Sequence, residues 1–284
     1  MKYSEILAEK FTDVLKCPVC AEKLSASENK KSLLCGGARK HCFDVAAKGY
    51  VNLALGHSGG GDPKDAVRSR TAFLNKGFYR PFADEVCRLL SEYVQSGDLV
   101  VDAGCGEGYY TSLVSEKCNV RAIGFDLSKS AIESGAASAS RQGLDNVAYA
   151  VAGIFSMPVK DECADAVINL FAPCAEEEFC RVLKKGGILL VAGAGEDHLY
   201  GFKSAIYDTP YKNELRADLP TRMEKLESVK VRFDITLETY EDKMNLFSMT
   251  PYYYRTSKED ADKLKAEAPI VTEVEFDIDI YRKR

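Results

Sequence analysis

The sequence has no run of about 18 apolar residues, the length that a membrane-spanning helix needs. Its first 15 residues carry charges throughout and lack the apolar segment of a secretory signal peptide. Internal repeats and low-complexity tracts are also missing. These absences indicate a cytoplasmic protein with no membrane partner.

Acidic residues outnumber basic ones, and the net charge of −5 argues against a general nucleic-acid-binding protein. The charge is uneven, however. Residues 1–80 hold 14 Lys and Arg against 8 Asp and Glu, a balance of +6, whereas the other 204 residues hold 24 against 35, a balance of −11. A basic N-terminal part favours docking of an anionic partner there. Ordinary solvated surface is the alternative that charge alone leaves open.

The ten cysteines fall into a clustered group and a scattered group. In a cytosolic chain, clustered cysteines indicate a metal site, and scattered ones behave as small buried hydrophobic residues. Cys17 and Cys20 form a C-x-x-C pair, Cys35 follows 15 residues later, and His41 and Cys42 compete as a fourth ligand. This spacing suits a structural zinc ion, which would supply folding energy to a small module. Free cysteines and a redox pair are the rivals, but a redox pair usually opens a helix behind a strand.

A glycine-rich break at residues 58–63 predicts a turn or connector. We therefore expect a zinc-binding module at residues 1–60 and a second domain at residues 61–284. An amphipathic helix is predicted over residues 77–94. Buried strands are then expected at residues 99–102, 121–126, 147–151, 164–171 and 187–192, with two amphipathic strands at residues 228–237 and 272–281. Strands that alternate with helices imply an α/β domain with a mostly parallel sheet.

The most informative motif follows the strand at residues 99–102. Asp102 precedes Gly104, Gly106 and Gly108, which form a G-x-G-x-G pattern that opens a helix. Alternate glycines allow a sharp turn and close approach of a ligand, and the helix N-terminus offers free N–H groups. The spacing resembles that of class I S-adenosylmethionine (SAM) methyltransferases, in which Asp102 or its neighbours would meet the methionyl ammonium. Another kind of nucleotide-binding turn, or a purely structural one, is the alternative.

A second acidic residue supports the same cofactor. Asp126 ends the next strand, 20 residues after Gly106, where a carboxylate can accept hydrogen bonds from both ribose hydroxyls. Many such methyltransferases carry a further acid after the third strand, but residues 152–158 contain none. We expect a backbone carbonyl or an apolar clamp to hold the adenine instead.

Taken together, these residues resemble the 23S rRNA guanine-N1 methyltransferases of the RlmA type. The matching stretches cover nearly the whole chain and include residues 17–20, 41–44, 48–53, 79–81, 102–111, 171–174, 198–199 and 249–251. The zinc module joined to residues 48–53 is specific, whereas the glycine loop alone is not. The resemblance implies a Rossmann-like class I fold with a seven-stranded sheet, and an enzyme that methylates a guanine N1 in a 23S rRNA hairpin.

The resemblance also implies roles for individual residues. The zinc ligands carried over are Cys17, Cys20, Cys35 and His41. Five residues separate Cys35 from His41, a longer gap than the family's, which keeps Cys42 open. The SAM contacts carried over are Tyr79, Gly106, Glu107 and His198. A core position for Tyr79 and a surface loop for His198 are the alternatives.

The acceptor guanine is expected beside residues 169–174, which we call the acceptor loop. Phe171 can stack on an extruded base, and Asn169 can hydrogen-bond the edge of that base. The equally open alternatives are that Phe171 is a core aromatic and that Asn169 caps the end of a strand. Guanine N1 carries a proton that must be lost, and the sequence identifies no catalytic base. RNA contacts are expected from the zinc module, from residues 64–70 and from the tyrosines at residues 252–254, which can instead alternate between core and site wall.

Two other functions and a homodimer stay open. A methyltransferase acting on a small molecule or protein would use the zinc module as a lid or for dimerisation, and would turn over without RNA. A SAM-sensing ribosome factor would bind the cofactor without methyl transfer. The basic N-terminal part weighs against the first alternative, and the intact glycine loop, Asp126 and acceptor loop weigh against the second.

Overall fold

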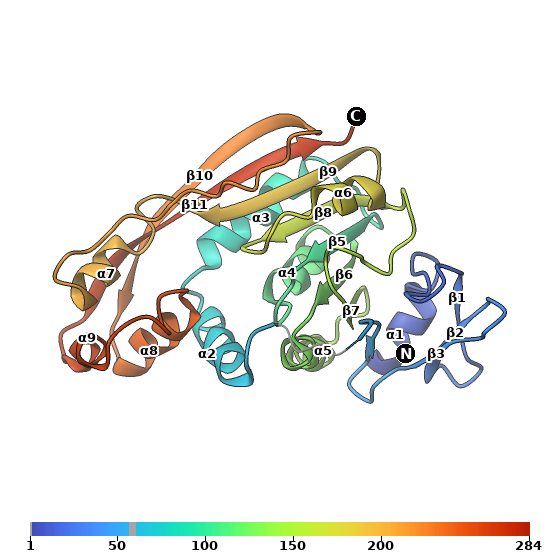
Figure 1. Ribbon diagram of the computed structural model, residues 1–284, viewed down its shortest axis with the longest axis horizontal. Coiled ribbons are helices and arrows are strands. Elements are labelled where there is room, and N and C mark those ends of the chain that lie inside the picture. The colour runs from blue at the N-terminus through green and yellow to red at the C-terminus, as the bar shows by residue number, and fades with distance from the viewer. Residues whose placement is uncertain (1, 57–60) are drawn as a thin grey trace.

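The computed structural model describes residues 2–56 and 61–284, and a sheet of eight strands forms its centre (Figure 1). The strand order is β10-β11-β9-β8-β5-β6-β7-β4. The ladders from β4 to β9 are parallel, and β11 and β10 are antiparallel. The strands are β4 (Tyr50–Asn52), β5 (Leu99–Ala103), β6 (Arg121–Asp126), β7 (Val147–Val151), β8 (Ala164–Leu170), β9 (Leu183–Ala194), β10 (Glu224–Leu237) and β11 (Ile270–Arg282).

Seven of these strands are the predicted ones, which confirms the mostly parallel α/β sheet. Strands β6 and β7 begin and end at the predicted residues, whereas β9 and β10 begin four residues early. The eighth strand, β4, lies within residues 1–60 and adds an edge strand to the seven-stranded sheet that the resemblance implied. Its residues Tyr50 to Asn52 pair with Tyr149 to Val151 of β7. Three residues are too few to show a strand period, so only the pairing reveals this strand.

Helices and the N-terminal segment cover the two faces of the sheet. Helix α3 begins with Pro81 in its first turn and buries a row of apolar residues, as its predicted amphipathic pattern requires. The Ser128 side chain accepts a hydrogen bond from Ala131 N and caps α5. The helices are α1 (Tyr3–Lys10), α2 (Lys64–Asn75), α3 (Arg80–Ser91), α4 (Tyr109–Lys117), α5 (Lys129–Gln142), α6 (Glu176–Val182), α7 (Tyr200–Ile206), α8 (Tyr240–Met249) and α9 (Lys258–Asp262), followed by the 3-10 turn η1 (Lys263–Lys265). Within the described chain, none is long and apolar enough to cross a membrane.

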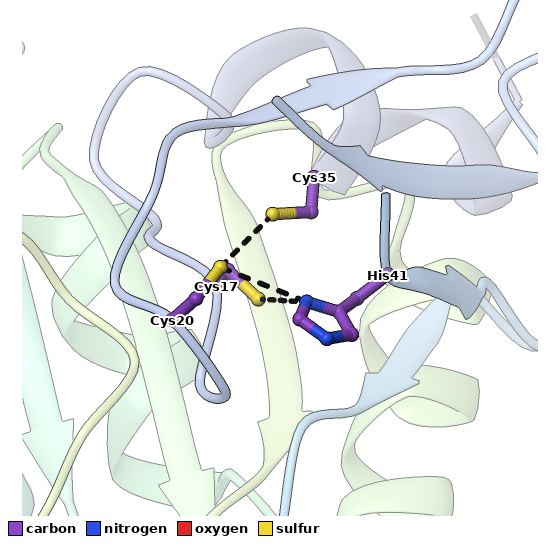
Figure 2. Close-up of side chains that lie close together, drawn as sticks. All are labelled: Cys17, Cys20, Cys35 and His41. Carbon is purple, nitrogen blue, oxygen red and sulfur yellow. Dashed lines mark hydrogen bonds between the residues drawn. The ribbon is translucent and has the colours of Figure 1, made fainter. Parts of the chain in front are cut away.

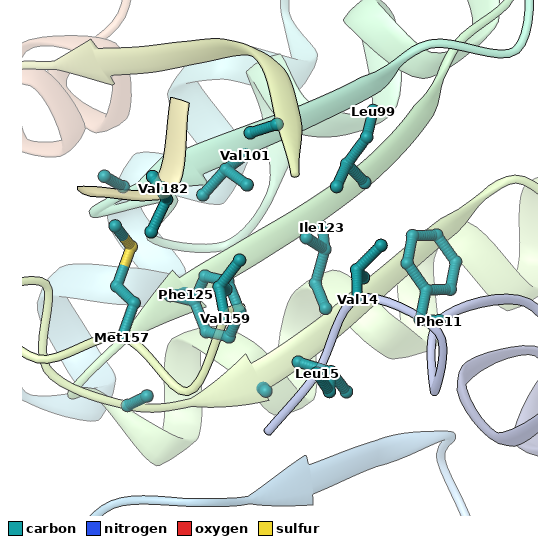
Figure 3. Close-up of a cluster of buried hydrophobic side chains, with 14 of the residues drawn as sticks. Phe11, Val14, Leu15, Leu99, Val101, Ile123, Phe125, Met157, Val159 and Val182 are labelled. Carbon is teal, nitrogen blue, oxygen red and sulfur yellow. The ribbon is translucent and has the colours of Figure 1, made fainter. Parts of the chain in front are cut away.

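One face of the sheet is closed by the N-terminal segment itself. The connection from β7 to β8, residues 152–163, contains no helix. Phe11, Val14 and Leu15 pack there against Ile123 and the neighbouring strand residues (Figure 3). The N-terminal segment therefore fills a layer that a connecting helix would otherwise supply.

The rest of the N-terminal module is a small antiparallel sheet of β1 (Leu24–Ala26), β2 (Ser32–Cys35) and β3 (Cys42–Asp44). Its buried residues Leu24 and Leu33 belong to the same apolar core as β5, β6 and β7. The predicted connector falls partly on residues 57–60, which lie outside the described residues, so the domain division at residue 60 stays a prediction.

Candidate active site and metal centre

Four ligand side chains meet at the base of the small N-terminal sheet (Figure 2). The ligand atoms of Cys17, Cys20, Cys35 and His41 all lie within 4.8 Å of one another. The Cys20 and Cys35 Sγ atoms are 3.3 Å apart, and His41 Nδ1 is 3.4 Å from Cys17 Sγ and 3.6 Å from Cys20 Sγ. A tetrahedral zinc ion with bonds of about 2.0–2.3 Å holds its ligand atoms roughly 3.3–3.8 Å apart. The donor set and its spacing therefore fit zinc.

The structure separates the two rivals for the fourth ligand position. His41 points into the cluster, whereas the neighbouring Cys42 is exposed and lies outside it. Successive residues of an extended chain point to opposite sides, so only one of the two can face the other ligands. The N–H of Gly37 approaches Cys35 Sγ at 3.3 Å, a contact that favours the thiolate form.

The glycine loop joins β5 to α4 in a conformation that requires glycine. Gly104, Gly106 and Gly108 have φ angles of 89°, 53° and 73°. A Cβ on Gly104 would lie 2.5 Å from Ala172 Cβ, and one on Gly108 would lie 2.4 Å from Tyr149. Side chains are therefore excluded on both conformational and steric grounds. The loop presents backbone close to the carboxyl ends of the central strands.

Asp102 is almost fully buried at the end of β5. The Thr111 hydroxyl donates to its Oδ2 atom at 2.5 Å. Burial raises the pKa of Asp102 to about 7, and the charges of Asp126 and Glu107 act in the same direction. A cationic group placed nearby would stabilise the carboxylate, so this residue fits an ammonium ligand.

Asp126 is fixed by backbone hydrogen bonds at the end of β6. The N–H of Gly106 donates to Oδ2 at 3.0 Å, and the N–H of Ser128 donates to Oδ1 at 2.7 Å. Burial raises the pKa of Asp126 in spite of these donors. Each oxygen retains a lone pair that can accept from a hydroxyl. The geometry fits the predicted contact with a ribose.

Arg70 of α2 lies against the glycine loop, a position that the sequence did not reveal. Its Nε donates to Glu107 Oε2 at 2.6 Å, and its NH1 pairs with Asp62. A Cβ on Gly106 would lie 3.1 Å from the guanidinium. Among residues 64–70, expected to contact RNA, Arg70 is therefore engaged at the loop rather than free for phosphate. No periodicity or motif in the sequence links residue 70 to residue 107.

Tyr79 and His198 contact each other in the wall of a cavity at the carboxyl ends of β8 and β9. His198 Nδ1 accepts from Glu275 N at 3.3 Å, so Nε2 carries the proton and faces the Tyr79 hydroxyl at 3.5 Å. Burial, assisted by the charge of Lys203, lowers the pKa of His198 to about 3. His198 is therefore a neutral imidazole in the site wall. Tyr79 is buried in the core and also lines the cavity, so its contact with SAM stays a prediction.

A cavity of about 760 Å³ opens beside the carboxyl ends of β8 and β9. Its walls come from α2, from the acceptor loop, from residues 192–199 and 213–218, and from the segment after α8. Tyr252 is buried, Tyr253 is half-buried and Tyr254 is 73% exposed, so exposure increases along the tyrosine run and does not alternate. Among the described residues, the Tyr252 hydroxyl has no hydrogen-bond partner. A polar group of a ligand can therefore bind there.

Phe171 and Asn169 take different positions at this cavity. Phe171 is 46% exposed and has a φ of 59°, an unfavourable backbone for a non-glycine residue. Asn169 is fully buried, and its Nδ2 donates to Ala103 O at 2.9 Å and Pro173 O at 3.2 Å. Its Oδ1 accepts from Arg216 at 2.8 Å. The hydrogen bonds thus favour the strand-end alternative for Asn169 and leave Phe171 facing the cavity.

Sequence reasoning also missed the residues between α7 and β10 that line the cavity. They are Asn213, Glu214, Arg216 and Asp218. Residues 207–223 form no helix or strand, so no periodic pattern indicates which side chains face inward. Their contacts appear only in the folded chain.

Comparison with known proteins yields two family matches and several relatives. A model described as a methyltransferase domain matches residues 95–249, and one described as RlmA, N-terminal, matches residues 15–54. A 23S rRNA (guanine(748)-N(1))-methyltransferase of Streptomyces fradiae is 34% identical over 190 residues, covering 65% of this chain and 65% of that protein. A putative 23S rRNA (guanine-N(1)-)-methyltransferase of Micromonospora griseorubida is 33% identical, with 65% and 67% coverage. A putative 23S rRNA (guanine-N(1)-)-methyltransferase of Bacillus subtilis is 29% identical, with 95% and 97% coverage.

Proposed function

This chain belongs to the methyltransferase family that carries an RlmA-type N-terminal zinc ribbon, and we propose that it methylates N1 of a guanine in 23S rRNA in the cytoplasm, using SAM. One observation carries the proposal. A single cavity is bordered by Arg70, which contacts the glycine loop, and by the exposed ring of Phe171. Cofactor and acceptor base can therefore meet in one partly enclosed space.

When bound, SAM supplies a methyl group activated on a sulfonium. The chain's own residues position it. The backbone of the loop at Gly104, Gly106 and Gly108, which carries no side chains, would lie against the cofactor. Asp102 would balance the ammonium, and Asp126 would accept from the ribose. Glu107 can share its carboxylate between Arg70 and the ligand. Tyr79 and His198 wall the side nearest the acceptor.

We expect the adenine of SAM to be held without the acid that many such methyltransferases carry after the third strand. Leu127 and Phe155, at 40% and 67% exposure, flank the carboxyl ends of β6 and β7 and offer an apolar clamp. This supports the expectation that residues 152–158 need no carboxylate.

An extruded guanine would stack on Phe171 within the cavity. The exposed ring lies 5.0 Å from Phe276 and 5.4 Å from Phe82, measured between centroids, so aromatic neighbours hold it in place. A base taken out of a helix needs such an apolar face to replace its lost stacking. Asn169 supports this loop from within, and a contact between its side chain and the base would require Arg216 to withdraw.

The zinc ribbon and its basic surroundings are suited to hold the rRNA. Residues 1–80 balance at +6, and Lys64 and Arg68 are exposed on α2, the helix whose Arg70 lines the cavity. Phosphate contacts of this kind position a nucleic acid without reading its sequence. A homodimer stays a prediction that light scattering on the purified protein would test.

The test is transfer of labelled methyl groups to 23S rRNA and to ribosomal particles that lack the modification. Nuclease digestion then identifies the labelled nucleoside. Label in 1-methylguanosine, lost in Asp126→Ala, supports the proposal. Label in a small molecule or protein without RNA would favour the first alternative. Tight SAM binding with no transfer to any acceptor would favour a non-catalytic ribosome factor.

A further inference from the structure

We propose that Arg216 is the residue that recognises guanine O6 and stabilises the negative charge that forms there when N1 is methylated. The inference rests on the proposed function and deepens it, because it names the group that selects guanine. Arg216 lines the cavity together with Phe171, and its side chain is only 14% exposed.

The segment that carries Arg216 is fixed to the end of the sheet although it is irregular. Asn213 Nδ2 donates to His198 O at 2.8 Å and to Gly195 O at 3.1 Å. Its Oδ1 accepts from the buried Lys203 Nζ at 2.6 Å, which also donates to Tyr211 O. These contacts hold residues 211–213 against β9 and α7. Arg216, three residues further on, therefore starts from a fixed position.

The guanidinium is itself oriented by four of its five N–H groups. Nε donates to Asp218 Oδ1 at 2.7 Å, and NH2 donates to Asn169 Oδ1 and Ala172 O, both at 2.8 Å. NH1 has one long contact, to Ala192 O at 3.4 Å. Since NH1 carries two hydrogens, one has no acceptor among the described residues. A fixed donor of this kind loses little freedom when it binds a ligand oxygen.

Asp218 serves to position Arg216 and does not accept the proton that guanine N1 loses during methylation. Partial burial acts to raise the pKa of Asp218, but hydrogen bonds from Cys174 N and Arg216 outweigh it and hold the pKa below its ordinary value. Cys174 N donates to Oδ2 at 2.6 Å, so both carboxylate oxygens are engaged. The pair thereby joins residues 216–218 to the acceptor loop.

The chemistry of guanine requires such a cation. When N1 loses its proton to a water molecule at the cavity mouth, the electron pair left on N1 delocalises onto O6. That pair forms the N1–methyl bond while the sulfur–methyl bond breaks, and the electrons of the broken bond stay on sulfur as a thioether. An N–H donor at O6 favours loss of the proton from N1. Adenine presents an amino donor at the same position, so the same N–H group disfavours it.

The experiment compares Arg216→Gln and Arg216→Lys with the wild-type enzyme in single-turnover methylation of 23S rRNA from pH 6.5 to 9.5. Arg222→Gln is the matched control, because Arg222 lies on the same segment, is exposed, and its guanidinium pairs with Glu177 at the surface. We expect Arg216→Gln to lower the rate about 100-fold at pH 7 and by much less at pH 9.5, where N1 ionises more readily unaided. Arg216→Lys should recover part of the loss. Binding of S-adenosylhomocysteine, measured by calorimetry, should change less than about twofold in every variant, since Arg216 acts on the acceptor.

A loss that is equal at all pH values and accompanied by weaker S-adenosylhomocysteine binding would assign Arg216 a structural role and overturn the inference. So would an unchanged rate. If the wild-type enzyme labels 1-methylguanosine and Arg216→Gln does so at the same rate, only the role of Arg216 is refuted. Wild-type enzyme that labels another nucleoside, or none, refutes the proposed function and this inference with it.

Discussion

Tyr50 lies opposite Tyr149 in the parallel ladder between β4 and β7, so the zinc-ribbon part of the chain supplies the edge strand of the methyltransferase sheet. The Tyr3 hydroxyl also donates to Val147 O of β7 at 3.3 Å. Removal of the N-terminal module would therefore expose a strand edge and an apolar face. The two parts are expected to unfold together.

Zinc binding should consequently stabilise the whole chain. We expect His41→Ala to lose most of its zinc and to lower the melting temperature by about 6–12 °C, which corresponds to about 3 kcal/mol. Cys42→Ser is the control, since Cys42 is exposed and outside the ligand cluster. Elemental analysis and calorimetric melting measure the two effects. Full zinc content in His41→Ala, or a second transition that moves alone, would contradict this prediction.

The ion pair between Arg70 and Glu107 should control the stability of the cofactor loop. Burial raises the pKa of Glu107 even though Arg70 opposes it, so its carboxylate depends on that partner. We expect Arg70→Met to lower the free energy of unfolding by about 3 kcal/mol at pH 7.5, because it leaves a buried charge unpaired. The group has a raised folded-state pKa, so the penalty disappears below its unfolded value of 4.5 and grows as pH rises.

Urea unfolding of Arg70→Met at pH 7.5 and pH 4.5 measures this difference. Arg68→Met on the same helix removes an exposed arginine and should have almost no effect. A loss for Arg70→Met that is as large at pH 4.5 as at pH 7.5 would assign it to packing instead of charge.

Binding of the cofactor should depend on pH through Asp102. Burial raises its pKa from 3.8 to about 7, so the free protein loses stability as pH rises through this window. A bound ammonium favours the carboxylate, and affinity should therefore fall up to about tenfold for each pH unit below 7. Calorimetric titration with S-adenosylhomocysteine, which carries the same ammonium, measures the profile. Asp102→Asn should bind more weakly with no such slope; an identical slope in this variant would assign it to another group.

Phe171 should contribute to acceptor binding without affecting the cofactor. We expect Phe171→Ala and Phe171→Gly each to lower kcat/KM for rRNA about 5- to 100-fold, the range for one lost stacking contact. Because φ is 59°, Phe171→Gly should be about 1 kcal/mol more stable than Phe171→Ala. Methylation kinetics and thermal melting separate the two effects. Wild-type kinetics in both variants would remove Phe171 from the acceptor site.

Local chemistry in the sequence determined much of this protein. The turn from Asp102 to Gly108 depends on the glycines within it, whose φ angles are positive, so their spacing alone predicted a turn that opens a helix. The buried strands β6 and β7 show continuous apolar runs and were found to their ends. Three of the zinc ligands followed from cysteine spacing, since a metal site requires particular donors.

Only the tertiary structure decided which distant residues meet. The choice of His41 over Cys42 depends on the direction of one side chain, and the place of β4 depends on pairing with a strand remote in sequence. Arg70 and Arg216 reach the site from segments whose patterns do not reveal which side faces inward. Such contacts arise because the fold brings charges together across long loops, and their energies depend on burial that no local pattern encodes.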